Sequence, residues 1–184
     1  MRGAIDAHLR RGFPGQRVVA QGWNTGAIAT ATPEVRVLRG DPETRGGLWL
    51  HVSSGAWSGT PAERIGYEFV LVTPYKTLRA VELLAMIVYY HTGGGVLKVG
   101  NTVPIGEPWL PGSACNALLV SDPYLLADEL WTLPLGRQEI RFLWIIPITP
   151  AERRFVGEYG LEALEQRFEL AGLEYWDPHR ASIV

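Results

Sequence analysis

The chain has 184 residues, of which 47 % are apolar and 20 % charged, a composition that suits one folded domain with a sizeable core. Its net charge is −2: residues 1–92 carry ten basic against seven acidic residues (+3), and residues 93–184 carry seven against twelve (−5). Neither half has the clustered basic stripe of a nucleic-acid-binding protein, so we expect no nucleic-acid partner. No apolar run reaches the length of a membrane span, and the single Cys115 excludes an internal disulfide. Both observations favour a cytoplasmic protein without a membrane association.

The first forty residues predict a short helix followed by a strand. Ile5 and Leu9 lie on one face of a helical pattern over residues 3–11. A glycine-dotted stretch follows, in which a short strand is expected over residues 27–32. The segment EVRVLRG (34–40) alternates apolar and polar residues, which predicts a half-buried strand.

Two alternating strands are predicted over residues 47–54 and 65–73, joined by a loop that contains Trp57. In the first strand, Trp49, His51 and Ser53 share one face. In the second, Glu68 lies on a face that turns apolar within two residues. A carboxylate in such a place is paired, protonated or functional, so Glu68 is the titratable group of most interest.

The middle of the chain predicts a covered helix and several short elements. The helix spans residues 77–91, with Thr77 as N-cap and the glycines 93–95 as its end, and it is apolar almost all round. A hairpin is expected at residues 97–105, a strand at 117–122, and a loop with a helical turn at 122–131.

The C-terminal part predicts a central strand and two helical segments. Both faces of the 139–148 strand are apolar from Phe142 to Ile146, which indicates a strand covered on both sides. Thr149 to Glu152 form a capping box with proline at the first helical position, and a last helix runs to about residue 171. The tail that follows, with Tyr175 and Trp176, is either a second interaction surface or a strap folded back on the core.

Together these elements predict a single α+β domain over residues 1–184: a mixed, largely antiparallel β-sheet packed with helices. The chain has no G-x-S-x-G nucleophile motif, and its four histidines lack metal-ligand spacing. It also lacks a phosphate-binding or dinucleotide fingerprint. We therefore expect no catalytic residues, no metal and no cofactor.

The order of several motifs resembles the suppressor of fused (SUFU) domain family, in particular its short single-domain bacterial members. These motifs are Gly66-Tyr67-Glu68-Phe69, the strand and helix start from Phe142 to Glu152, and the segment GLEAL at 160–164. The likeness covers a core of about residues 35–170. Residues 1–34 form an N-terminal helix and irregular segment outside it, and residues 172–184 form a C-terminal tail.

The resemblance implies a SUFU-like α/β sandwich and a non-enzymatic, protein-binding role. For a bacterial member it implies an immunity-type protein that binds and neutralises a partner toxin. The predicted partner-binding residues are Trp49, His51, Ser53, Trp57 and Glu68. If the 47–54 strand lies at a sheet edge, it could pair with a strand of the partner. Two alternatives stay open: an enzyme or small-ligand-binding protein with a dispersed pocket around Glu68, and self-association, since the sequence leaves the oligomeric state unknown.

Overall fold

The computed structural model describes residues 2–12, 16–59, 64–123 and 128–184. The chain divides into two compact units, one of residues 1–97 and 122–144 and the other of residues 98–121 and 145–184. The single domain over residues 1–184 stays a prediction. Within the described ranges, no helix is both long and apolar enough to cross a bilayer.

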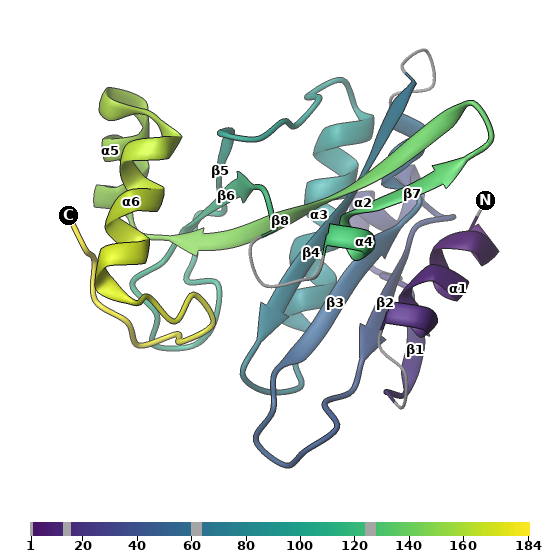
Figure 1. Ribbon diagram of the computed structural model, residues 1–184, viewed down its shortest axis with the longest axis horizontal. Helices are drawn as coiled ribbons and strands as arrows, with labels where there is room; N and C mark the ends of the chain where they lie inside the picture. The colour runs from purple at the N-terminus through teal and green to yellow at the C-terminus, as the bar shows by residue number, and fades with distance from the viewer. Residues whose placement is uncertain (1, 13–15, 60–63, 124–127) are drawn as a thin grey trace. The chain divides into compact units, whose positions relative to one another are not determined.

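The first unit contains most of the sheet (Figure 1). Its helical elements are α1 (Arg2–Gly12), α2 (Gly26–Ala31), the 3-10 helix η1 (Ala56–Gly59), α3 (Arg79–Thr92) and α4 (Asp128–Trp131). Its strands are β1 (Val18–Gln21), β2 (Arg36–Gly40), β3 (Trp49–Ser54), β4 (Ile65–Thr73), β7 (Thr132–Leu135) and the first part of β8 (Gln138–Ile148). The strand order is β1-β2-β3-β4-β8, and β7 also pairs with β8. Strands β4 and β8 are parallel, whereas the pairs β1–β2, β2–β3, β3–β4 and β7–β8 are antiparallel.

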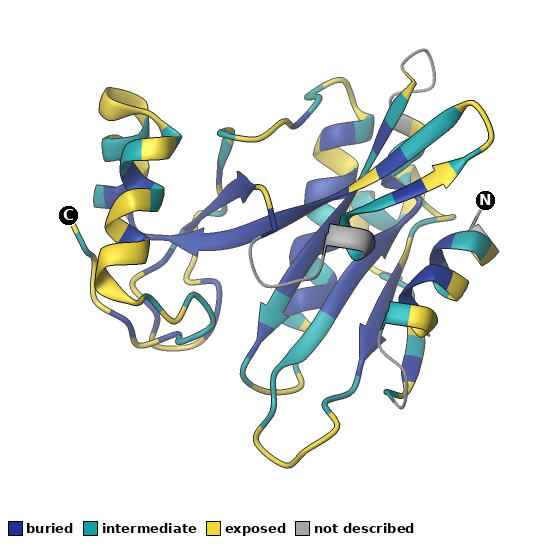
Figure 2. Ribbon diagram, in the orientation of Figure 1, coloured by how far each residue is buried: buried dark blue, intermediate teal, exposed yellow. Residues whose placement is uncertain are grey.

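Cross-strand apolar pairs build the core on one face of this sheet. Val52 of β3 lies directly opposite Leu38 of β2 and Val70 of β4. Ile5 and Leu9 of α1 pack onto the same cluster, which confirms the predicted apolar face of the N-terminal helix. Helix α3 covers the other face of the sheet, and most of its residues are buried (Figures 1 and 2). Strands between two helical layers are expected to be apolar on both sides.

The second unit contains β5 (Thr102–Pro104), β6 (Ala117–Ser121), the end of β8, α5 (Pro150–Tyr159) and α6 (Leu161–Ala171). The predicted capping box is confirmed: Glu152 N–H donates to Thr149 Oγ1 at 3.2 Å, and Thr149 N–H donates to Glu152 Oε2 at 2.8 Å. Arg180 of the tail forms two 2.7 Å hydrogen bonds to the Glu152 carboxylate and one of 2.8 Å to the carbonyl of Pro147. The tail is therefore a strap held by a buried ion pair.

The predicted fold class is confirmed, since the described strands form a mixed, mostly antiparallel sheet with helices packed on it. The strands predicted over residues 65–73, 117–122 and 139–148 are present, and residues 142–146 are buried as expected. The residues 60–63 and 124–127 of two predicted loops lie outside the described residues.

Two predicted elements are wrong, and two strands were missed. Residues 27–32 belong to helix α2 and its C-cap instead of a strand, because three alanines favour a helix and Thr32 closes on the carbonyl of Ile28. The hairpin expected at residues 97–105 does not form, since β5 pairs with the later strand β6. The short strands β1 and β7 were not predicted. Helix α3 begins after Leu78, although the Thr77 hydroxyl still accepts the N–H of Arg79 at 3.1 Å.

Candidate functional site

Glu68 lies at the centre of a buried hydrogen-bond cluster between β4 and the turn that ends β3. Its side chain is completely buried. One carboxylate oxygen accepts the N–H of Gly55 at 2.7 Å, and the other accepts the N–H of Ala56 at 3.3 Å and the hydroxyl of Ser53. Ser53 Oγ in turn accepts the N–H of Phe69 at 2.8 Å. Glu68 therefore fixes the path of the chain from β3 into η1.

Burial raises the pKa of Glu68 to about 7, because the charged carboxylate loses the solvation of water. The hydrogen bonds from Ser53 and from the main chain act in the opposite direction, since they stabilise the ionised form. A pKa near neutrality is suited to proton transfer. Here, however, both carboxylate oxygens are occupied by groups that hold the fold.

His51 belongs to a second buried chain of hydrogen bonds. Its Nε2 lies 3.1 Å from Thr73 Oγ1, whose hydrogen is donated to the carbonyl oxygen of Tyr75 at 2.9 Å. Thr73 must therefore accept from His51, which places the imidazole proton on Nε2. Among the described residues, His51 Nδ1 has no hydrogen-bond partner. Burial, followed by the positive charge of Arg39, lowers the pKa of His51 to about 4, so the ring is neutral at neutral pH.

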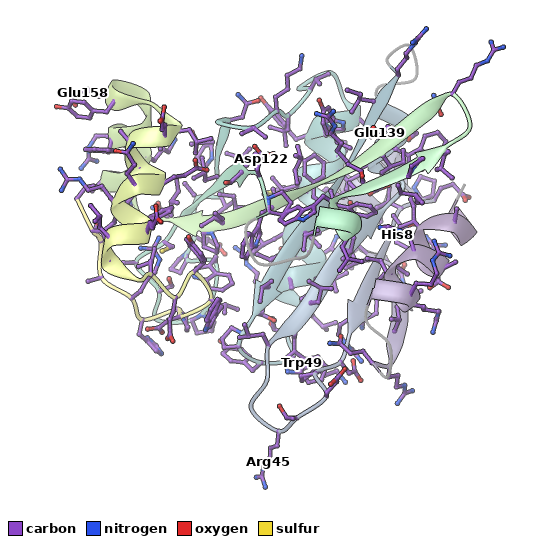
Figure 3. All side chains as sticks on the ribbon, in the orientation of Figure 1. His8, Arg45, Trp49, Asp122, Glu139 and Glu158 are labelled. Carbon is purple, nitrogen blue, oxygen red and sulfur yellow. The ribbon has the colours of Figure 1, made fainter. Side chains whose placement is uncertain are left out.

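Trp49 begins β3, directly after the loop that carries Arg45 (Figure 3). The Arg39 guanidinium lies 5.1 Å from the centre of the Trp49 ring and donates to Asp41 Oδ1 at 2.8 Å. Trp49 is half-buried, so part of the ring is open to solvent. It is the predicted binding residue of β3 that a partner can reach.

Trp57 lies in η1 and packs against the apolar core of the first unit. Its approach to β4 depends on Gly66, where an added Cβ would lie 2.9 Å from Trp57 Cβ and from Ile140 Cδ1. Trp57 is half-buried, and its indole nitrogen is buried with no partner among the described residues.

The structure thus brings together Ser53, Glu68 and the turn before Trp57, whereas Trp49 and His51 have separate partners. One expectation needs correction, and the condition for strand pairing with a partner is not met. The predicted outward face of β3 is not open at His51 and Ser53, because both side chains are completely buried. Strand β3 is also not an edge strand, since β2 and β4 pair with its two sides and leave no place for an added strand.

Sequence reasoning missed Thr73 and the main-chain donors of Gly55 and Ala56. The usable signal was the glycine that directly follows two serines at the end of a predicted strand, because a glycine there indicates a tight turn. Over the ranges that the structure describes, no group of three or more His, Cys, Asp or Glu residues is placed to hold a metal ion.

A small pocket adjoins this cluster in the first unit. It is lined by the end of α2, the turn 32–35, Gly55, Ser58 and the last residue of α3, Thr92, and has a volume of about 230 Å³. Gly55 contributes to its wall, while the N–H of the same residue is bound to Glu68. The pocket and the Glu68 cluster thus share one turn of the chain.

Comparisons with known proteins identify the family. No curated protein sequence gives a significant match. Among solved structures, a SUFU (suppressor of fused protein) homologue from Neisseria gonorrhoeae is 31 % identical with a TM-score of 0.86, and the match covers 100 % of this chain and 96 % of that one. A chain of the Sufu–Fu complex (13 % identical, TM-score 0.74) matches over 99 % of this chain and 91 % of its own length. Drosophila Suppressor of Fused (13 % identical, TM-score 0.72) matches over 97 % of this chain, which spans half of the Drosophila one. These two likenesses concern the fold alone.

The family model of the suppressor of fused protein (SUFU) matches residues 32–181, which is most of the sequence and includes both the Glu68 cluster and Arg180. The chain therefore belongs to the suppressor of fused protein (SUFU) family.

Proposed function

We propose that this chain is a non-enzymatic protein-binding domain, and that it acts as a bacterial immunity-type protein which binds and neutralises a partner toxin. The observation that carries the proposal is membership of the SUFU family, together with the similar bacterial homologue. One relative was solved in a complex with a protein, Fu, which supports a protein partner for this chain also. The buried thiol of Cys115 suits a reducing cytoplasm.

The buried cluster supports a binding role more than an enzymatic one. A general acid or base must reach its substrate, yet the Glu68 side chain is completely buried and its oxygens accept bonds from the turn before η1. The alternative of an enzyme or small-ligand-binding protein rests on the pKa of about 7 of this carboxyl group. The hydrogen bonds of Glu68 fit a structural role, in which the carboxylate holds the turn before η1, better than a role in proton transfer.

We place the partner contact around the half-buried Trp49 and Trp57. The buried His51, Ser53 and Glu68 contribute by holding β3 and the turn that follows it. Trp49 is opposite Thr73 in the β3–β4 register, and Tyr75, two residues farther on, is 42 % exposed. Aromatic side chains of this kind dominate binding energy at protein interfaces because they bury a large area with little loss of conformational freedom. The rings of Trp49 and Tyr75 therefore provide the apolar part of the proposed surface.

The test is capture of partners from host lysate with the tagged chain, followed by co-expression of each captured protein with and without it. A partner that is toxic alone and harmless with the chain is the expected result. Trp49→Ala should weaken its binding by about 2 kcal/mol or more, as truncation of an interface hot spot does. The matched control is Trp176→Ala in the tail, which should leave binding unchanged.

Three outcomes would contradict the proposal or part of it. A chain that captures no protein and is a dimer in solution would favour self-association. A captured protein whose growth effect is the same with and without the chain would reject neutralisation. Loss of binding in Trp176→Ala but not in Trp49→Ala would move the surface to the tail.

A further inference from the structure

The pocket beside Gly55 is small, and its lining combines apolar residues with several polar groups. Its volume of about 230 Å³ is below the roughly 300–1,000 Å³ of pockets that hold drug-sized ligands, so it suits a single side chain better than a cofactor. Its lining includes three hydroxyl groups, those of Thr32, Ser58 and Thr92. The chemistry of the pocket depends on where the hydrogens of these groups point.

Each of the three hydroxyls donates its hydrogen to a main-chain carbonyl. Thr32 Oγ1 donates to the carbonyl of Ile28 at 2.8 Å, and Ser58 Oγ donates to that of Gly55 at 2.8 Å. Thr92 Oγ1 donates to the carbonyl of Val88 at 2.9 Å. A hydroxyl has one hydrogen and two lone pairs, so all three oxygens retain only acceptor capacity for a ligand.

Three main-chain N–H groups of the lining are also in use. The N–H of Thr32 bonds to the carbonyl of Ile28 at 2.9 Å, and that of Val35 bonds to the carbonyl of Thr32 at 3.1 Å. The N–H of Gly55 is held by Glu68 at 2.7 Å. Pro33 has no N–H. These groups can therefore accept hydrogen bonds from a ligand, but they cannot donate any to it.

The electrostatic surroundings of the pocket are negative, which also suits a ligand that donates hydrogen bonds. Thr92 is the last residue of the 14-residue helix α3, whose C-terminus carries partial negative charge. The basic residue in that last turn is His91, and its Nδ1 accepts the N–H of Leu97. The end of α3 therefore favours a positive charge.

The neighbouring turn already holds one guanidinium. Arg36 donates to the carbonyls of Pro33 and Val35 at 2.7 and 2.8 Å. Arg36 is not a lining residue of the pocket, and its charge is exposed to solvent and screened there. The carbonyls of Pro33 and Val35 are therefore already occupied by a cationic group outside the pocket, which leaves the hydroxyls of the lining as its acceptors.

From these contacts we infer that the pocket receives a primary ammonium or guanidinium group, supplied by a lysine or arginine side chain of the protein partner. The ammonium of lysine has three donors and no acceptor, and the guanidinium of arginine has five, which complements the three acceptor hydroxyls of the lining. The assignment to a partner side chain rests on the proposed function, whereas the preference of the pocket for a cation does not.

The first experiment tests the pocket without any partner. The ¹⁵N-labelled full chain is titrated with Nα-acetyl-lysine methylamide, Nα-acetyl-arginine methylamide and the neutral Nα-acetyl-norleucine methylamide, which has the lysine chain without its ammonium. We expect the two cationic compounds to shift the amide signals of Gly55, Ser58 and Thr92, and the neutral one to leave them in place. Equal shifts with the neutral compound, or no shift with any of them, would overturn the inference.

Two variants remove an acceptor each. Thr92→Val and Ser58→Ala should each weaken binding of the lysine compound about tenfold, the change expected for one hydrogen bond to a charged group. Thr44→Val, an exposed threonine in the β2–β3 loop, is the matched control and should bind as the unaltered chain does. The same spectra report whether each variant is folded. Folded variants that bind with unchanged affinity would overturn the inference.

A second experiment identifies the source of the cation. Once a partner has been captured, its addition should shift the same three amide signals, and the lysine compound should compete with it. A partner that binds without affecting Gly55, Ser58 and Thr92 would overturn the assignment to a partner side chain and leave the proposed function standing. If the cationic compounds bind but the capture experiment yields no protein partner, the proposed function would be rejected and the cation preference of the pocket retained.

Discussion

The two buried titratable groups near β3 should give stability opposite dependences on pH. Burial raises the pKa of Glu68 from 4.5 to about 7 and lowers that of His51 from 6.5 to about 4. Between pH 4.5 and 7 the folded chain holds the Glu68 proton that the unfolded chain releases, so the Glu68 contribution to the free energy of unfolding falls as pH rises. Between pH 4 and 6.5 the unfolded chain holds a His51 proton that the folded chain excludes, so the His51 contribution rises with pH.

The magnitude follows from the two shifts. A tenfold change in an ionisation constant is equivalent to about 1.4 kcal/mol, so the change in pKa from 4.5 to about 7 for Glu68, or from 6.5 to about 4 for His51, corresponds to about 3 kcal/mol for each group. The maximum slope is about 1.4 kcal/mol per pH unit for either group, with opposite signs. In the shared window from pH 4.5 to 6.5 the two contributions nearly cancel in the unaltered chain. A variant that removes only one of the two groups should therefore show a pH dependence of stability that is not visible in the unaltered chain.

The test uses Glu68→Gln and His51→Gln, each compared with the unaltered chain by urea unfolding at pH values from 4 to 8. Tryptophan fluorescence is a suitable signal, since the chain has seven tryptophans. Relative to the unaltered chain, the stability of Glu68→Gln should rise by up to about 3 kcal/mol between pH 4.5 and 7, and that of His51→Gln should fall by a similar amount between pH 4 and 6.5. Each change should level off outside its window. Stability curves that stay parallel to that of the unaltered chain would refute the reasoning.

The remaining predictions concern other buried contacts. Arg180→Ala should lower the free energy of unfolding by about 3–5 kcal/mol, because it leaves the completely buried Glu152 carboxylate without its cation; thermal unfolding checks this, and an unchanged midpoint would contradict it. Gly66→Ala should cost about 1–3 kcal/mol in urea unfolding, since the new Cβ meets Trp57 at 2.9 Å; a neutral effect would show that η1 can shift away. Cys115 should react with a thiol reagent only after unfolding, because it is completely buried and burial raises its thiol pKa; rapid labelling of the folded chain would disprove this.

The sequence predicted the regular elements well where a local pattern determines them. Alternation located β4, and the apolar run located β8. The capping box at Thr149 and Glu152 fixed the start of α5, because each of its contacts spans only three residues. The prediction was wrong where a strand pairs with a segment distant in the sequence, or where an element lacks a clear sequence pattern. Strand β5 pairs with a strand more than ten residues later, and the six residues of α2 lack a periodic apolar pattern.

The candidate site was predicted in part for a similar reason. The pattern showed that Glu68 lies on a covered face, but it could not show which groups satisfy the carboxylate. Those groups are main-chain N–H groups of Gly55 and Ala56, and their positions depend on the turn and not on residue type. The direction of His51 followed from alternation, but its burial depends on helix α3, which covers that face of the sheet (Figure 1). Likewise, Arg180 acts on Glu152 over 28 residues, a distance that no local pattern covers.

The contacts of Glu68 connect the buried cluster with the polarity of the pocket. The peptide unit between Gly55 and Ala56 donates its N–H to Glu68 at 3.3 Å, while its carbonyl accepts the hydroxyl of Ser58 at 2.8 Å. Glu68 also binds the N–H of Gly55 and so removes that donor from the pocket wall. Because hydrogen bonds in series polarise one another, the buried carboxylate orients this peptide and, through it, the Ser58 hydroxyl. The lone pairs of Ser58 are then left for a ligand. In this arrangement Glu68 contributes to binding by fixing the donors and acceptors of the turn, which needs neither access to solvent nor proton transfer.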